Sequence, residues 1–352
     1  MPKPVQIAGR TLGAGQPPLI VAELSGNHHG SLAQALALVE RAAAAGADAI
    51  KLQTFIPERL TLDSERPEFR IDNPASLWHG RKLIDLYRET QTPLDWHPPL
   101  FQRCRELGLI GFSSPFDPES VEFLDRLEVP CFKIASFEAQ DLPLVQKAAA
   151  TGKPLIVSTG MARVSDIEAT VQAARSAGCR DLILLKCTSA YPAPPDQANL
   201  ATLPHLAELF DCPVGLSDHS LGLGVALAAT ALGACLIEKH FTLARSGGGP
   251  DAAFSLEPPE LDLLVSEARR AWQALGRVQY GPVASEIGGK RRRSLYALRD
   301  IAQGELFTPD NLGSVRPGLG LAPRHLPDLL GRRASRDIPF ATPLDWSLVS
   351  PR

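Results

Sequence analysis

Two histidines come at the ends of consecutive short apolar runs, PVGLSDHS (213–220) and LIEKHFT (236–242). If these runs are neighbouring strands of a parallel sheet, about 4.8 Å apart, the imidazoles of His219 and His240 can both reach one ion. Two histidine ligands leave the remaining coordination positions to water and a substrate oxygen, which suits a catalytic metal better than a structural one. Taken alone, the pair does not decide between a metal site and two histidines with unrelated roles.

Lysines, carboxylates and hydroxyl residues end most of the other apolar runs. A lone one is usually a solvated or capping group, but a buried charge is costly unless it is paired or binds a ligand. A cavity with several inward lysines and hydroxyls suits a multiply charged anion that carries phosphate and carboxylate groups. The residues concerned are Glu23, Ser25, Asn27, Lys51, Gln53, Ser113, Ser114, Lys133, Ser136, Ser158, Thr159, Lys186, Thr188, Ser189, Ser217, Asp218, Glu238 and Lys239.

The apolar runs alternate with alanine-rich helical stretches such as 31–47 and 164–178. Eight strand–helix repeats predict an α/β fold, a closed (β/α)8 TIM barrel whose active site lies at the carboxyl ends of the strands. A doubly wound open sheet is the competing architecture, but neither its G-x-G-x-x-G fingerprint nor a Walker phosphate loop is present. The predicted strands are 19–25, 49–55, 109–116, 131–136, 154–160, 182–189, 213–220 and 236–242.

Two regions depart from this repeat. Residues 57–98 are long for a βα connection and contain a helix-like stretch, LWHGRKLIDLYRET (77–90); they predict either a wall or lid over the substrate or a peripheral helix. From Arg291 onward the chain has 10 Arg against six Asp and Glu, with short β-type runs between turns. We expect a barrel over 1–282, a linker over 283–291 and a small β-rich domain over 292–352, which is small enough to need a partner surface.

Composition excludes several classes of protein. With 44% hydrophobic and 21% charged residues the chain is typical of a folded globular protein. A net charge of −3 argues against a nucleic-acid binder, and no apolar run approaches the roughly 20 residues of a membrane helix. The six cysteines show no C-x-x-C pair, and the N-terminal residues show no signal peptide. We expect a cytoplasmic enzyme with reduced cysteines and neither nucleic-acid nor membrane partners.

Over nearly its full length the chain resembles the sialic acid synthase family, the phosphoenolpyruvate-condensing synthases of nonulosonic acids. The similarity lies in IVAELSGNHHG (20–30), KLQTF (51–55), GFSSPFDPESVEFL (111–124), FKIASFEAQDLPLV (132–145), KPLIVSTGMA (153–162), LLKCTSAYPAP (184–194), GLSDHSLG (215–222) and IEKHFTL (237–243). The tail, through ALRDIAQGELFTPDNL (297–312) and VRPGLGL (315–321), is similar to the antifreeze-like (SAF) domain of that family.

Within the family, details point to the branch that makes pseudaminic acid. They include AELSGNH (22–28), LWHGRKLIDLYRETQTPLDWH (77–97) and KCTSAYPAP (186–194). The branches that make N-acetylneuraminic and legionaminic acids stay as alternatives. In KIASFE, Ala135 and Phe137 depart from the neuraminic pattern, so sugar contacts of that branch do not transfer directly.

The resemblance implies a role for each matching residue. Phosphoenolpyruvate would contact Lys51, Gln53, Lys133, Ser136, Ser158, Thr188 and Ser217, and Thr188 stands where the family often has Asn. Glu23, Lys51, Lys133 and Asp251 would be catalytic, and Tyr191, Asp251 and Arg316 would contact an amino-sugar aldehyde. His219 and His240 would hold a divalent metal, normally Mn²⁺, with Mg²⁺ or Co²⁺ as alternatives. Arg316 would reach from the C-terminal domain into the partner's barrel in a domain-swapped homodimer.

Two other classes of protein remain open on the residues alone. A Schiff-base aldolase would use Lys133 or Lys186 as nucleophile, which the histidine pair and the hydroxyls disfavour. A non-enzymatic protein would use the tail as an ice- or carbohydrate-binding module on an inert barrel, which the polar strand ends disfavour.

Overall fold

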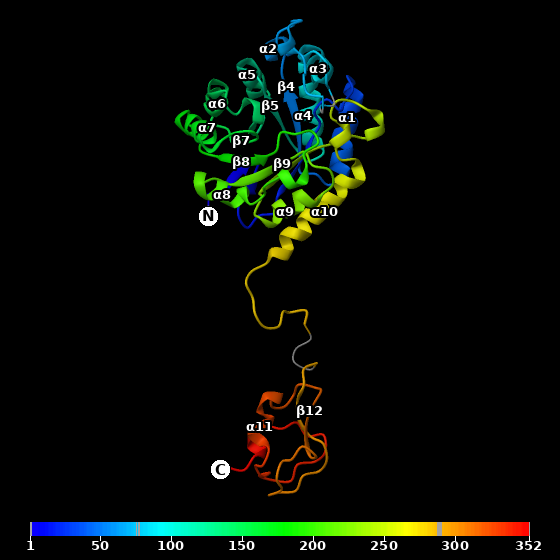
Figure 1. Ribbon diagram of the computed structural model, residues 1–352, viewed down its shortest axis with the longest axis vertical. Helices are drawn as coiled ribbons and strands as arrows, with labels where there is room; N and C mark the ends of the chain where they lie inside the picture. Colours follow the sequence, from blue (N-terminus) through cyan, green and yellow to red (C-terminus); the bar gives the residue numbers. More distant parts are fainter. Residues whose placement is uncertain (1, 75, 77, 287–290, 352) are drawn as a thin grey trace. The chain divides into compact units, whose positions relative to one another are not determined.

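In a computed structural model of the chain, the eight predicted strands close into a parallel barrel, which confirms the predicted fold class (Figure 1). Around the barrel the order is β10-β3-β4-β5-β6-β7-β8-β9. Each strand lies inside its predicted range. Their bounds are β3 Leu19–Glu23, β4 Ala49–Thr54, β5 Ile110–Pro115, β6 Phe132–Ile134, β7 Leu155–Ser158, β8 Leu182–Cys187, β9 Val214–Asp218 and β10 Leu236–His240.

The structure describes residues 2–74, 76, 78–286 and 291–351. They form two compact units, residues 1–276 and 277–352. Residues 287–290 of the expected linker lie outside the described residues.

Alternation along the strands divides their side chains between two apolar regions. Residues such as Val21, Phe112 and Ile183 fill the barrel interior, and the intervening positions pack against the helices. A hairpin of β1 (Val5–Ile7) and β2 (Arg10–Leu12), which the sequence analysis did not predict, adds further apolar side chains to the interior cluster. The hairpin therefore closes the amino-terminal end of the barrel interior with apolar side chains.

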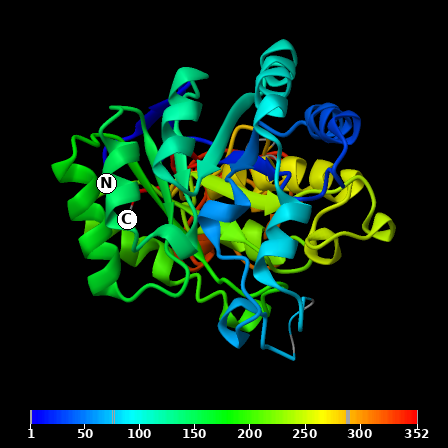
Figure 2. The same ribbon diagram turned by 90° about the horizontal axis from the view of Figure 1, so that it is seen from above.

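Helices form an outer layer around the strands (Figures 1 and 2). Several begin at a capping side chain: Ser31 for α1, Asp117 for α5 and Asp141 for α6. None of the helices in the described part of the chain is long and apolar enough to cross a membrane. The remaining bounds are α1 Leu32–Ala44, α4 His97–Glu106, α5 Pro118–Arg126, α6 Leu142–Ala149, α7 Val164–Ser176, α8 Thr202–Phe210, α9 Gly224–Ala231 and α10 Pro258–Leu275.

The insertion after β4 has less helix than expected. It contains α2 (Pro57–Leu60) and α3 (Leu83–Thr90), so the helix-like stretch 77–90 is helical only in its second half. Gly80 adopts φ +78°, a left-handed conformation that interrupts a helix. Residues 75 and 77 lie outside the described residues. The core helix α4 begins at His97, inside the range assigned to the insertion.

The second unit has a small apolar core of its own. Strands β11 (Ser294–Ala297) and β12 (Leu312–Val315) pair antiparallel, and the short helix α11 (Leu326–Leu329) packs with them. Phe307 and Leu344 are fully buried in this core. This agrees with the expected small, β-rich and irregular module.

Candidate active site

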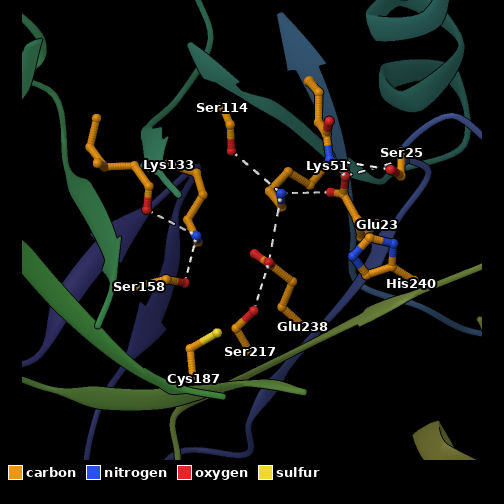
Figure 3. Close-up of polar contacts among 12 residues, drawn as sticks. Glu23, Ser25, Lys51, Ser114, Lys133, Ser158, Cys187, Ser217, Glu238 and His240 are labelled. Carbon is orange, nitrogen blue, oxygen red and sulfur yellow. Dashed lines mark hydrogen bonds and ion pairs between the residues drawn. The ribbon is translucent and has the colours of Figure 1, made fainter. Parts of the chain in front are cut away.

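The carboxyl end of the barrel holds a group of buried charged side chains (Figure 3). Lys51 Nζ on β4 lies 2.7 Å from Glu23 Oε2 on β3 and 3.6 Å from Glu238 Oε1 on β10. It also donates to Ser114 Oγ at 3.4 Å. The strand register accounts for the contact, because Glu23 stands opposite Lys51 on one side and His240 on the other.

Lys133 is a second ammonium group in the same space, and it is 1% exposed. Its Nζ donates to Ser158 Oγ at 2.7 Å and to the carbonyl oxygen of Ile134 at 3.0 Å (Figure 3). No carboxylate of the described residues lies within ion-pair distance of it, and burial lowers the pKa of Lys133. An anionic ligand beside Lys133 would stabilise its charged form.

The two carboxylates differ in their proton affinity. Burial raises the pKa of Glu23, although Lys51 opposes the effect. Burial would also raise the pKa of Glu238, but the ammonium groups of Lys133 and Lys51 outweigh it and the pKa of Glu238 is lowered. Paired groups whose pKa values are pushed apart mark acid/base roles, so Glu23 suits a proton acceptor and Glu238 a permanent negative charge.

The two predicted histidines lie side by side, with ring centroids 5.3 Å apart. His219 Nδ1 lies 3.0 Å from the carbonyl oxygen of Thr188, and because a carbonyl only accepts, Nδ1 carries the proton. His219 Nε2 has no hydrogen-bond partner in the part of the chain that the structure describes. His240 Nδ1 is buried without a hydrogen-bond partner among the described residues, and burial lowers the pKa of His240 well below its ordinary value. Burial would lower the pKa of His219, but Cys187 and the Thr188 carbonyl outweigh it, and the pKa of His219 is raised. His240 therefore presents a neutral imidazole that fits a divalent metal, whereas His219 would bind the metal in its deprotonated form. Within the described residues no larger group of His, Cys, Asp or Glu is arranged to hold one.

The predicted hydroxyl residues fall into two sets. Ser158 contacts Lys133, Ser217 Oγ donates to Glu238 Oε1 at 3.2 Å, and Ser136 Oγ accepts the Gly160 amide at 3.2 Å. Thr188 differs, because its Oγ1 donates to the carbonyl oxygen of Gln197 at 3.1 Å.

The hydroxyl of Ser189, the residue after Thr188, lies with that of Ser136 instead. The two oxygens would be 2.1 Å and 2.7 Å from a Cβ added at Gly160. A glycine at 160 is therefore required for the two hydroxyls to meet. Ser189 was among the polar strand ends in the sequence but was not selected as a contact residue.

Gln53, expected to contact phosphoenolpyruvate, lies beside this group, and so do Tyr191 and Asp251, which are expected to contact the sugar. Gln53 Nε2 donates to Glu23 Oε1 at 2.9 Å and to Ser25 Oγ at 3.3 Å, and Ser25 Oγ donates to Asp251 Oδ2. Burial raises the pKa of Asp251, whose Oδ2 lies 3.9 Å from His240 Nδ1. The Tyr191 ring lies 4.3 Å from the His219 ring between centroids.

Other polar strand ends do not join the group. Lys186 lies between the interior residues Leu185 and Cys187 and therefore faces the opposite side of β8, which removes it as an inward nucleophile. Lys239 forms a buried ion pair with Asp218 at 2.7 Å. On β10 it lies between Glu238 and His240, whose side chains point into the barrel, so Lys239 faces the other side of the strand. Arg316 belongs to the second unit, where it is exposed at the end of β12.

Three residues near the site carried no specific signal in the sequence. Glu138 follows β6, and burial raises its pKa to about 7, with Lys133 and Lys51 among the charges that act on it. Cys187 Sγ lies 3.9 Å from His219 Nδ1. Trp78, in the insertion, donates from Nε1 to the carbonyl oxygen of Pro250 at 3.1 Å.

Together these side chains provide two ammonium groups and several hydroxyls for an anion, a carboxylate suited to accept a proton, and an imidazole pair suited to a metal. Each of the eight strands, or the loop that follows it, contributes to the group. It thus has the position expected of an active site in this fold.

Comparison with known proteins agrees with this chemistry. The NeuB family matches residues 38–280, and the SAF domain matches residues 292–350. The chain is 45% identical over 331 residues to the pseudaminic acid synthase of Campylobacter jejuni subsp. jejuni serotype O:23/36 (strain 81-176), covering 93% of this chain and 95% of that protein. It is 42% identical to the pseudaminic acid synthase of Helicobacter pylori (strain ATCC 700392 / 26695), covering 94% and 97%.

A crystal structure of the N-acetylneuraminic acid (sialic acid) synthetase from Leptospira borgpetersenii serovar Hardjo-bovis is similar with a TM-score of 0.72. The identity is 33%, over 81% of this chain and 94% of that one. The family match covers more than half of the chain, and the resemblance first seen in the strand-end motifs is confirmed. The chain belongs to the NeuB family and carries a SAF domain at its C-terminal end.

Proposed function

We propose that this protein is a pseudaminic acid synthase. It would condense phosphoenolpyruvate with open-chain 2,4-diacetamido-2,4,6-trideoxy-altrose and water, giving pseudaminic acid and phosphate. The observation that carries the proposal is the convergence of Lys51, Lys133 and Glu23 with the imidazoles of His219 and His240 at one end of the barrel. The choice of product is supported by the 45% and 42% identity to synthases of that acid, against 33% to a synthetase of N-acetylneuraminic acid.

Binding of phosphoenolpyruvate follows from charge. Among the described residues Lys133 has hydroxyl and carbonyl partners and no carboxylate partner, so its ammonium group can pair with phosphate or carboxylate oxygens. Ser136, Ser158, Ser217 and Gln53 would complete the site with hydroxyl and amide donors. Thr188 would join them only by releasing its hydrogen bond to the carbonyl oxygen of Gln197. Lys51 already faces Glu23 and Glu238, and burial, which lowers its pKa, is outweighed by these two carboxylates. Lys51 therefore stays charged and compensates the leaving phosphate.

The reaction makes one carbon–carbon bond and exchanges the phosphate oxygen on carbon 2 for a water oxygen. Carbon 3 of the enol attacks the aldehyde carbon, whose oxygen takes up a proton and becomes a hydroxyl. Positive charge develops at carbon 2, and water adds there. Glu23 accepts the proton of that water, because its raised pKa makes it the better base of the two carboxylates. The tetrahedral intermediate then expels phosphate from carbon 2. A divalent ion held by His219 and His240, Mn²⁺ or alternatively Mg²⁺ or Co²⁺, would supply Lewis-acid polarisation of the aldehyde oxygen.

Asp251, Tyr191 and Arg316 would bind the sugar. Asp251 is placed for this by the hydrogen bond from Ser25, and Tyr191 by its contact with the His219 ring. We propose that Arg316 acts in the partner's barrel within a domain-swapped homodimer, with domains over 1–282 and 292–352 joined by a linker over 283–291. We also propose that the protein works in the cytoplasm, where its six unpaired, buried cysteines would stay reduced.

The proposal is tested by incubating the protein with phosphoenolpyruvate and Mn²⁺, and separately with the altrose-type sugar, its legionaminic-type isomer and N-acetylmannosamine. Phosphate release is followed in each reaction, and the product is identified by mass spectrometry. We expect the altrose-type aldehyde to give the highest kcat/KM. A higher value with either of the other sugars would assign the protein to another branch of the family.

A further inference from the structure

The insertion between β4 and α4 brings an aromatic side chain to the active site. The Trp78 ring lies 6.0 Å from the Tyr191 ring between centroids, and Trp78 Nε1 donates to the carbonyl oxygen of Pro250 at 3.1 Å. Pro250 precedes Asp251, so Trp78 touches both loops that carry the proposed sugar ligands. Its side chain is half-buried, which leaves part of the indole open to a ligand.

Trp78 extends an aromatic surface that starts at the imidazole pair. Tyr191 contacts His219 at 4.3 Å and His240 at 6.5 Å between ring centroids, and Phe254 contacts Tyr191 at 5.4 Å and His240 at 5.0 Å. The Trp78 ring lies against Tyr191 at a tilt of 47° between the ring planes. We call Trp78, Tyr191 and Phe254 the aromatic wall. Tyr191 and Phe254 lie at the imidazole end of the wall, and Trp78 continues it beyond Tyr191.

Ion pairs hold the segment that carries Trp78. Lys82 Nζ lies 2.7 Å from Asp63 and 2.8 Å from Glu65, and Arg88 lies 2.9 Å from Glu58. Arg70 and Lys82 also form a β-bridge across the loop that contains Trp78. Exposed ion pairs contribute little one by one, but this network cross-links both ends of the loop. The ion pairs and the bridge thus hold together the two ends of the loop that carries Trp78.

We propose that Trp78 is a specificity-determining residue that binds the apolar substituents at the end of the sugar remote from the aldehyde. This inference rests on the proposed function. The aldehyde carbon must lie near the imidazoles, which places the far end of an extended six-carbon chain along the aromatic wall. In the proposed substrate that end carries a methyl at carbon 6 and an acetamido group at carbon 4. N-acetylmannosamine carries hydroxyls at both positions.

The wall discriminates between these sugars through solvation. The transfer of a methyl group from water to the face of an indole ring lowers the free energy of binding. A hydroxyl in the same place loses hydrogen bonds to water that an aromatic ring does not replace. An indole at this position therefore favours the 6-deoxy sugar over its hydroxylated analogue.

The test is steady-state kinetics of the full-length Mn²⁺-loaded protein and its W78A and W78F variants with both sugars at saturating phosphoenolpyruvate. We expect W78A to raise KM for the altrose-type sugar about tenfold, the size of a lost aromatic contact, and to lower the preference over N-acetylmannosamine to the same degree. KM for phosphoenolpyruvate should not change. W78F keeps a ring but loses the donor to Pro250, so its KM should lie between those of wild type and W78A.

W96F is the matched control, since Trp96 stacks edge-on against His28 at 5.4 Å and packs between the barrel and the helices. It should leave the sugar preference unchanged. If the wild type condenses the altrose-type sugar and W78A keeps both its KM and its preference, the inference is overturned and the proposed function stands. An equal loss of kcat with both sugars, with a raised KM for phosphoenolpyruvate, would also overturn it by showing a merely structural role. If the wild type releases no phosphate with any of the aldehydes, the proposed function itself fails and the inference with it.

Discussion

Lys51 Nζ lies 2.7 Å from Glu23 Oε2, and the two side chains come from directly paired positions on adjacent strands. Gln53 and the Ser25 amide bond the other oxygen of Glu23, at 2.9 Å and 3.2 Å. The carboxylate is therefore fixed in orientation, while Lys51 is shared with Glu238. A base held in this way needs little rearrangement to accept a proton from a bound water.

Replacing Glu23 by glutamine should remove the proton acceptor and keep the size and shape of the side chain. We expect Glu23→Gln to lower kcat by about 10²- to 10⁴-fold, the usual contribution of a general base, with an unchanged dissociation constant for phosphoenolpyruvate. Steady-state rates and calorimetric titration measure the two quantities. Glu122→Gln on α5, which alters an exposed ion pair with Lys147 on α6, is the control. Near-normal turnover of Glu23→Gln would exclude it as the base.

The bond that breaks can be followed with isotopes. In ¹⁸O-enriched water, addition of water at carbon 2 should leave the label in the keto group of the product and none in phosphate. The product must be analysed before its keto oxygen exchanges with solvent. Mass spectrometry of both products distinguishes the routes, because labelled phosphate would mean attack at phosphorus instead.

Removal of metal should abolish turnover and be reversed by Mn²⁺. His219→Ala and His240→Ala should each weaken Mn²⁺ binding by more than about a hundredfold, since loss of even an outer partner of a metal ligand costs 10- to 100-fold. Electron paramagnetic resonance of free Mn²⁺ measures the affinity without turnover. The exposed His205 on α8 provides the control variant His205→Ala. Unchanged Mn²⁺ affinity in both site variants would contradict the assignment.

Glu138 should make stability depend on pH. Burial raises its pKa to about 7 from an ordinary value of 4.5, so the folded protein holds a proton that the unfolded chain releases. The stabilisation by protonated Glu138 is therefore complete below pH 4.5 and is lost as the pH rises through 7. We expect Glu138→Gln to raise Tm relative to wild type at pH 8 and to have a smaller effect at pH 5. Equal effects of the variant on Tm at the two pH values would contradict the raised pKa.

Arg316 should act in trans if the dimer is domain-swapped. Arg316→Ala should raise KM for the sugar and leave that for phosphoenolpyruvate unchanged, whereas the exposed Arg324→Ala should affect neither. At a sugar concentration far below the raised KM of Arg316→Ala, mixing this variant with inactive Glu23→Gln should restore up to about a quarter of wild-type activity, because half of the random dimers then hold one intact site. No recovery after subunit exchange would argue against a swap. Full activity after deletion of 285–352 would remove Arg316 from the site altogether.

Repeated local patterns made the barrel predictable. Each of its eight strands is a short apolar run with helical sequence after it, and the closed order follows from that repeat. The β1–β2 hairpin escaped prediction because three-residue strands carry too little pattern. In the stretch 77–90 the periodicity suggested a helix, but Gly80 is left-handed there.

Within the site, the alternation of side chains along each strand determines which residues point into the barrel and converge. Lys51 and Lys133 point inward, whereas Lys186 and Lys239 are one position out of phase, which alternation alone would have shown. Thr188 and Ser189 come after the end of β8, where side chains no longer alternate between two sides. Alternation therefore could not predict that the hydroxyl of Ser189, and not that of Thr188, lies beside Ser136. Trp78 and Glu138 depend on how loops fold over the barrel, and no local pattern reports such contacts.

The β1–β2 hairpin gives the barrel a floor. Val5, Ile7 and Leu12 are almost fully buried beneath the interior side chains, so nothing passes through the centre of the molecule. Both reactants must then arrive, and both products depart, across the same rim. The reactant that binds deepest must therefore bind first, and the product that lies deepest must leave last. By closing one end of the barrel, the β1–β2 hairpin favours an ordered mechanism of substrate binding and product release.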